Sequence, residues 1–169
     1  VGLLVLLGFW AYSSVYILDE QERGVVLRFG EYHSTLQPGF NFQPGLIDTV
    51  TRVNVTAERQ YEPSVANSLM LTQDENIVVV PLTVQYNIKD ATEYVLNIRD
   101  PEETLEQATD SAIRHVVGGS QLDNVISAGR ELLRVEVELR LQSYLDAYGA
   151  GINIIDVTLQ EGTAPEAVK

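Results

Sequence analysis

The stretch IVVVPLTVQYNI, residues 77–88, decides the fold, because every second side chain along it is apolar. Alternation with a period of two indicates a β-strand that buries one face. Pro81 lies on the opposite face and cannot donate to a neighbouring strand, which favours an edge position or a bulge. The alternating apolar side chains are Val78, Val80, Leu82, Val84, Tyr86 and Ile88.

N-terminal to this strand, short apolar runs alternate with turn residues. The runs at 25–29, 49–61 and 68–72 predict further strands, and the segment QPGFNFQPG at 37–45 predicts a turn-rich loop. These patterns indicate a β-rich region between residues 19 and 76.

C-terminal to the strand, the periodicity becomes helical. Asp100 and Pro101 occupy the N-cap and first positions of a helix that we expect to end at Gly118. A second helix is expected from Ala128 to Tyr148, capped by Ser127, and a closing strand at 152–159. The expected apolar face of this second helix comprises Leu132, Leu133, Val137, Leu141, Tyr144, Leu145 and Tyr148. The chain therefore belongs to the α+β class.

The first 18 residues, VGLLVLLGFWAYSSVYIL, carry no charged side chain. A helix that spans a bilayer needs roughly 20 mostly apolar residues, so we expect a transmembrane helix at 1–18, truncated at its N-terminus. Trp10, Tyr12 and Tyr16 are residue types that favour the membrane–water interface. A buried core helix is an alternative, and so is a signal peptide, although no small-residue cleavage site follows Leu18.

The charge distribution excludes some functions and favours one topology. The net charge is −13 and no Lys/Arg cluster is present, so the chain is not suited to bind nucleic acid. Cysteine is absent, which excludes disulfides and cysteine metal sites. Acidic residues directly after Leu18 favour a location outside the cytoplasm for the rest of the chain.

A search for catalytic groups finds no candidate site. The two histidines, His33 and His115, have no second histidine or acid at metal-ligand spacing. No nucleophile elbow, phosphate-binding loop or dinucleotide fingerprint occurs. The neighbouring Asp74 and Glu75 are expected in a solvated loop. We therefore expect a protein that is not an enzyme and that has no catalytic, cofactor-binding or metal-binding residues.

Two surfaces are candidates for binding. Phe40, Phe42, Leu46 and Ile47 lie in the turn-rich loop, where they either contact the membrane or pack beneath the β-rich region. On the second predicted helix, the charged side chains crowd the surface that the apolar face leaves free. Its arginines Arg130, Arg134 and Arg140 are the candidate assembly interface, and an ordinary solvated helix face is the alternative.

The apolar N-terminus is followed by ERGVVLRFG at 22–30 and PGFNFQPGLIDTV at 38–50. This order of segments resembles the SPFH or band 7 superfamily, which includes stomatins, prohibitins and flotillins. Three further segments resemble the HflK branch of this superfamily. They are LTQDENIVVV at 71–80, QATDSAIRHVVG at 107–118 and GINIIDVTLQ at 151–160.

The resemblance implies a domain organisation and a function. It implies a β-rich SPFH1 region at 19–76, an α/β SPFH2 region at 77–162 and the start of a coiled-coil helix at 163–169. It also implies a scaffold in the bacterial inner membrane, with its SPFH domain on the periplasmic side. Such a scaffold forms a cage with an HflC-like subunit around an FtsH-like AAA protease and limits the membrane substrates that reach it.

Two other functions remain open. A stomatin- or flotillin-like scaffold would organise lipids without the protease, and the aromatic loop fits it equally well. A membrane-anchored enzyme associated with a protease would need a nucleophile and a base, and the sequence offers neither at a recognisable spacing.

Overall fold

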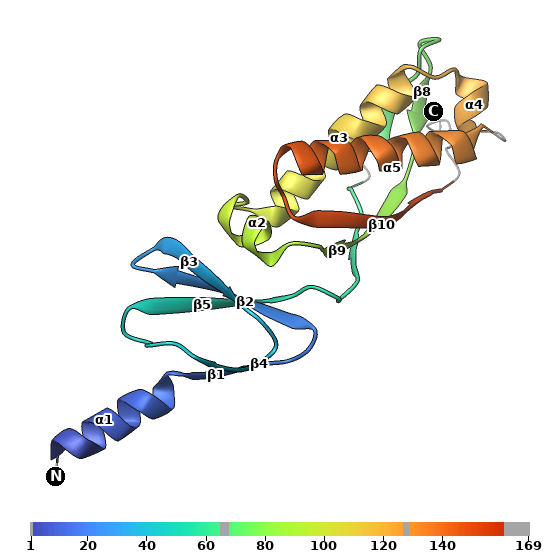
Figure 1. The fold of residues 1–169 in the computed structure, drawn as a ribbon. Coiled ribbons are helices and arrows are strands. Elements are labelled where there is room, and N and C mark those ends of the chain that lie inside the picture. Colours follow the sequence, from blue (N-terminus) through green and yellow to red (C-terminus); the bar gives the residue numbers. More distant parts are fainter. Residues whose placement is uncertain (1, 65–67, 127–128, 161–169) are drawn as a thin grey trace.

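The computed structural model describes residues 2–64, 68–126 and 129–160, which form an elongated molecule (Figure 1). Helix α1 (Gly2–Ser13) lies at one end, a small β region adjoins it, and a larger α/β region forms the other end. The mixture of helices and antiparallel sheets confirms the α+β class.

The small β region is built around β2, which pairs with a strand on each side in the order β3-β2-β5. A two-stranded ribbon of β1 and β4 lies beside this sheet. One face of the ribbon packs on it, because Leu18 joins Val26 and Leu36 in a buried cluster. The strands are β1 (Val15–Leu18), β2 (Glu22–Arg28), β3 (Glu31–Leu36), β4 (Gly39–Phe42) and β5 (Asp48–Asn54).

The expectation of one helix over residues 1–18 is wrong at its C-terminal end. Helix α1 ends at Ser13, and Val15–Leu18 is strand β1. The Ser13 and Ser14 hydroxyls both donate to the Trp10 carbonyl, at 3.1 and 2.7 Å, and serine side chains that bond backbone in this way compete with helix continuation. Among the helices within residues 2–64, 68–126 and 129–160, none has the length and apolarity that a membrane crossing requires.

The larger region consists of an antiparallel sheet with helices on one face (Figure 1). The sheet order is β10-β9-β6, and α3 and α5 pack together against it. The hairpin β7–β8 packs on α3 beside the short helix α4. The elements are β6 (Arg59–Tyr61), β7 (Leu69–Leu71), β8 (Ile77–Val79), β9 (Leu82–Ile88), α3 (Pro101–Gly118), α4 (Leu122–Ile126), α5 (Arg130–Ala147) and β10 (Ile152–Leu159).

The stretch at 77–88 therefore divides at Pro81 into β8 and β9, which belong to different sheets. The expected cap of α3 is confirmed, because the Asp100 carboxylate accepts from two backbone N–H groups of the first turn. Residue 127, the expected cap of α5, lies outside the described residues, as does the expected coiled-coil start at 163–169.

Helix α2 (Ala91–Leu96) connects the two regions, and the sequence patterns did not predict it. The Asp90 carboxylate caps it by accepting from the backbone N–H groups of Thr92 and Glu93. Its Ala91 packs with Ile88 of β9 and with two valines of the small sheet in one buried cluster. The boundary between the two regions lies between β5 and β6, because β6 pairs with β9 of the larger region.

Candidate functional site

The outer face of the β1–β4 ribbon is apolar and exposed. The antiparallel register places Val15 opposite Phe42 and Ile17 opposite Phe40, so these four side chains share one face. Phe40 is 72% exposed, and the other three side chains are also exposed. The alternation leaves Leu18, on the other face, in the core.

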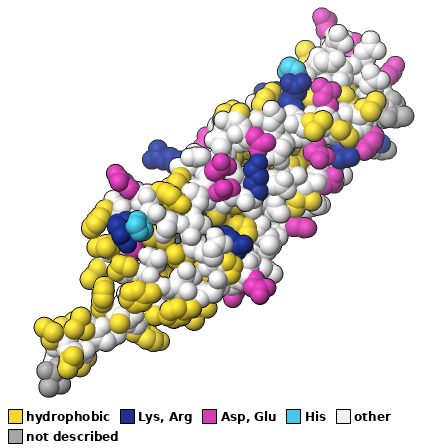
Figure 2. Space-filling model, in the orientation of Figure 1, with side chains coloured by type: hydrophobic (Ala, Val, Ile, Leu, Met, Phe, Trp, Pro, Cys, Tyr) yellow, Lys and Arg dark blue, Asp and Glu magenta, His cyan; other side chains and the backbone are white. Residues whose placement is uncertain are grey.

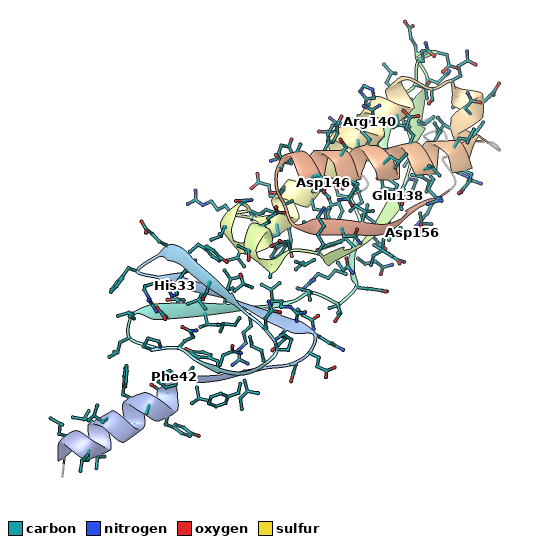
Figure 3. All side chains as sticks on the ribbon, viewed as in Figure 1. His33, Phe42, Glu138, Arg140, Asp146 and Asp156 are labelled. Carbon is teal, nitrogen blue, oxygen red and sulfur yellow. The ribbon has the colours of Figure 1, made fainter. Side chains whose placement is uncertain are left out.

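Helix α1 and the β4–β5 loop extend this apolar face. The Trp10 and Phe42 rings meet edge to face, with 6.4 Å between centroids (Phe42 is labelled in Figure 3). The Gln43 N–H donates to the Ser14 carbonyl at 2.8 Å, which ties the ribbon to the end of α1. A groove of about 540 Å³ lies between α1 and the loop and is lined mainly by apolar side chains, among them Leu3, Leu6, Trp10 and Leu46.

We call this surface the apolar end. Figure 2 shows hydrophobic side chains gathered over α1 and the adjoining small β region, while most charged side chains lie over the larger region. Leu46 is 82% exposed, Ile47 and Tyr12 are exposed, and Trp10 and Tyr16 are half-buried. Phe40 and Phe42 therefore do not pack beneath the small sheet. The apolar end comprises the exposed apolar residues of α1 together with Trp10, Val15, Ile17, Phe40, Phe42, Leu46 and Ile47.

An ion pair lies at the edge of the apolar end. The Arg28 guanidinium donates to both carboxylate oxygens of Asp48, at 2.8 and 3.0 Å, and the Asp48 side chain is buried. These hydrogen bonds hold the pKa of Asp48 below its ordinary value and raise that of Arg28. The arginine charge is thus neutralised within the chain.

The three arginines of the candidate assembly interface differ in their surroundings. Arg134 contacts the carboxylates of Glu131, Glu138 and Asp156 at 2.8–3.0 Å, and this cluster joins α5 to β10 (Glu138 and Asp156 are labelled in Figure 3). Its hydrogen bonds with Glu131 raise the pKa of Arg134. Reversing Arg134 would disturb the fold of the subunit itself.

The other two arginines lie on the same helix. Arg140 pairs with Glu136 at 3.5 Å, and its Nε atom is buried without a hydrogen-bond partner. Arg130 begins α5 and is half-buried. All three arginines thus lie on α5.

The exposed surface of α5 also carries an apolar stripe that the sequence analysis assigned in part to the core. Leu132 is 77% exposed and Leu139 is 67% exposed, and Val135 lies between them. The buried side chains are Leu133, Val137, Leu141 and Leu145, on the opposite face of the helix. Leu132 was therefore misplaced, and so was Tyr148, which is exposed. The spacing i, i+3, i+7 was the pattern that could have revealed this outer stripe.

The described residues contain no group of three or more His, Cys, Asp or Glu side chains placed to hold a metal ion. His33 lies on β3 of the small region and His115 on α3 of the larger one, and both are exposed. Asp74 has a structural role, because its carboxylate accepts from the Thr72 hydroxyl and the Leu122 N–H. These bonds lower the pKa of Asp74 and attach the β7–β8 turn to α4.

Comparison with known proteins gives a consistent set of relatives. The model of the SPFH domain / Band 7 family matches residues 16–169. Protein HflK of Vibrio cholerae is 42% identical over 98% of this chain and 41% of its own length. Protein HflK of Haemophilus influenzae is 40% identical over 100% of this chain and 41% of its own length. Modulator of FtsH protease HflK of Escherichia coli is 40% identical over 95% of this chain and 38% of its own length. The chain thus spans about two fifths of the length of these relatives.

Proposed function

Because the chain belongs to the SPFH domain / Band 7 family, we propose that it is a non-catalytic membrane scaffold similar to HflK. In this proposal it regulates the access of membrane substrates to an FtsH-like protease. The name of the Escherichia coli relative, Modulator of FtsH protease HflK, supports that partner.

The apolar end is the single observation that carries the membrane part of the proposal. It joins α1, both ribbon strands and the β4–β5 loop in one surface with no charged member. Contiguous exposed apolar patches on soluble monomers rarely exceed a few hundred Å², and larger ones mark protein or membrane contacts. We propose that α1 belongs to a membrane anchor and that Phe40, Phe42, Leu46 and Ile47 contact the same bilayer, with Trp10, Tyr12 and Tyr16 at its interface.

We further propose that the region after Leu18 lies on the periplasmic side of the inner membrane. The acidic residues that follow the ribbon strand support this topology, since positive residues favour the cytoplasmic side. A cysteine introduced at the exposed Gln107 should react with a membrane-impermeant thiol reagent in cells with a permeabilised outer membrane. Labelling that requires lysis of the inner membrane would refute the topology.

Assembly with an HflC-like subunit into a ring or cage is also a proposal. We assign the contact to the outer face of α5, where the apolar stripe Leu132, Val135 and Leu139 would be buried. Arg140 would set register, since charges at the rim of an interface contribute more to partner choice than to affinity. Arg130 lies seven residues before the buried Val137 and therefore on the other face of α5, so it would contribute only from the N-terminal end of the helix. Arg134 would act indirectly, by holding α5 against β10.

Affinity purification of the tagged protein from native membranes in mild detergent tests the proposal. An HflC-like subunit and an FtsH-like protease should both co-purify. A stomatin- or flotillin-like scaffold acting on lipids alone is the second candidate, and the apolar end supports it equally. Recovery of the chain with lipids but with neither protein partner would favour that function and refute ours.

A further inference from the structure

The turn between β2 and β3 carries a large aromatic side chain at a position with a positive φ angle, which is unfavourable for residues other than glycine and asparagine. Phe29 and Gly30 form a two-residue loop between the paired residues Arg28 and Glu31, with φ angles of 51° and 87°. Two successive positive φ angles are typical of a type I′ turn, which favours Asn or Gly at both positions. Phe29 is nevertheless present and is 80% exposed, so it adds no core packing that offsets the strain.

The turn is fastened to the β4–β5 loop. The Phe29 N–H donates to the Ile47 carbonyl at 3.2 Å. The adjacent position on each strand is occupied by Arg28 and Asp48, which form the ion pair. Backbone and side-chain bonds thus hold the turn and the loop as one rigid edge. We call Phe29, Gly30, Leu46 and Ile47 the turn edge.

The turn edge is continuous with the apolar end. Leu46 belongs to both, since it also lines the groove against α1. Figure 1 shows the β2–β3 turn at the border of the small region, on the side from which α1 projects. The neighbouring Arg28 is paired with Asp48, whereas Glu31 and His33 of β3, which follow the turn, are exposed.

We infer that Phe29 inserts into the headgroup–acyl boundary of a phospholipid bilayer and is a second membrane contact of the small β region. The inference rests on the proposed membrane location of the apolar end. A lipid surface fits better than a protein partner, because the edge continues the uncharged apolar end and the adjacent Arg28 is already paired with Asp48. The ribbon and the β4–β5 loop would contact the bilayer close to α1. A further contact at Phe29, on the separate β2–β3 turn, would fix the orientation of the small region on the membrane.

Site-specific fluorescence tests the insertion directly, since the chain has no native cysteine. Phe29→Cys carrying an NBD group is reconstituted, as the full chain, into phosphatidylcholine vesicles that contain lipids spin-labelled near the headgroup. We expect a blue-shifted emission and strong quenching. Glu75→Cys is the matched control, because Glu75 also has a positive φ and is exposed, but lies on the β7–β8 turn of the other region. It should give the emission of NBD in water, without quenching.

Labelling at Phe42 separates this inference from the proposed function. Quenching at Phe42→Cys without quenching at Phe29→Cys would overturn the inference and leave the membrane contact of the apolar end intact. Absence of quenching at both sites would refute both. A blue shift at position 29 that appears with rising protein concentration in lipid-free detergent would identify a second copy as the occupant, and that result also overturns the inference.

Phe29→Asn removes the ring without harming the turn. Asn-Gly is the favoured pair in type I′ loops, so the melting temperature should be unchanged or higher. In this background, an NBD label at Leu46→Cys should lose most of its quenching by the spin-labelled lipids, because the edge lifts from the bilayer. Unchanged quenching at Leu46 would show that Phe29 does not hold the edge in the membrane.

Discussion

Gly151→Ala is expected to destabilise the larger region and its junction with the small one. Gly151 has a φ of 64°, and its carbonyl accepts from the N–H groups of Lys89 and Asp90, just before α2. A Cβ atom here would lie 2.3 Å from the Asp90 carbonyl oxygen and 3.0 Å from the Tyr94 nitrogen. Both are backbone atoms, so no side-chain rotation can relieve the contact.

The size of the effect follows from two contributions. A non-glycine residue in the left-handed region costs about 1 kcal/mol, and overpacking against a rigid neighbour costs about 1–3 kcal/mol more. A total near 3 kcal/mol, divided by a urea slope of about 2 kcal/mol/M, lowers the unfolding midpoint by roughly 1.5 M. Domains of this kind have unfolding free energies of about 5–15 kcal/mol, so the variant should still fold.

Urea unfolding followed by circular dichroism in detergent measures the shift. Gly149→Ala is the matched control, because Gly149 has a φ of 60° but its added Cβ would meet the side-chain nitrogen of Asn97, at 2.8 Å. That amide can rotate away if it gives up its hydrogen bond to the Gly149 carbonyl. With about 1 kcal/mol for the positive φ and about 0.5–1 kcal/mol for the lost bond, we expect a loss of roughly 1.5–2 kcal/mol, or a midpoint shift of less than about 1 M. Equal shifts in the two variants would refute the backbone-contact argument and leave only the φ contribution.

Three further predictions concern the surfaces and the ion pair. Phe40→Asp with Phe42→Asp should lift the ribbon from the bilayer and reduce lipid spin-label quenching of a probe on the β4–β5 loop. Inserting a charge costs roughly 2.5–3.5 kcal/mol at the bilayer centre on insertion scales, and less near the interface. Phe40→Leu with Phe42→Leu should behave as wild type. Leu132→Ser with Leu139→Ser should weaken binding of the HflC-like subunit at least about tenfold in size-exclusion titrations, because burying one leucine contributes roughly 1.5 kcal/mol or more; unchanged affinity would remove α5 from the interface. The folded-state pKa of Asp48 is lowered by its arginine partner, so the stabilisation is complete above the ordinary value of 3.8 and is lost as the pH falls through the folded-state pKa. Asp48→Asn should therefore lose less stability than wild type between neutral pH and about pH 3, and equal losses in urea midpoint would contradict the assignment.

The sequence predicted those features that depend on local chemistry. Asp100 before Pro101 specified the start of α3, and the alternation through Val84 and Tyr86 specified the buried face of β9. The family resemblance, carried by short segments, was confirmed by the match over residues 16–169. Each of these depends on neighbours in the chain, which a sequence pattern records.

Features that depend on distant partners were less accessible. Val15–Leu18 continues an apolar run, and only pairing with β4, more than 20 residues away, makes it a strand. The outward position of Leu132 depends on which side of α5 meets α3 and β10, and both sides carry apolar residues. The sequence left Arg134 available for contact with another subunit, whereas in the structure it pairs with Asp156 of β10.

The junction through α2 sets the reach of the molecule. Val25 and Val53 of the small sheet pack with Ile88 and Ala91 in one buried cluster, and the Thr35 and Thr92 hydroxyls lie 2.6 Å apart across the same contact. A junction that is packed in this way is rigid, so the distance between the two regions does not vary as it would across a flexible linker. Copies anchored in one bilayer would therefore hold the ends of their β10 strands at the same distance from the membrane.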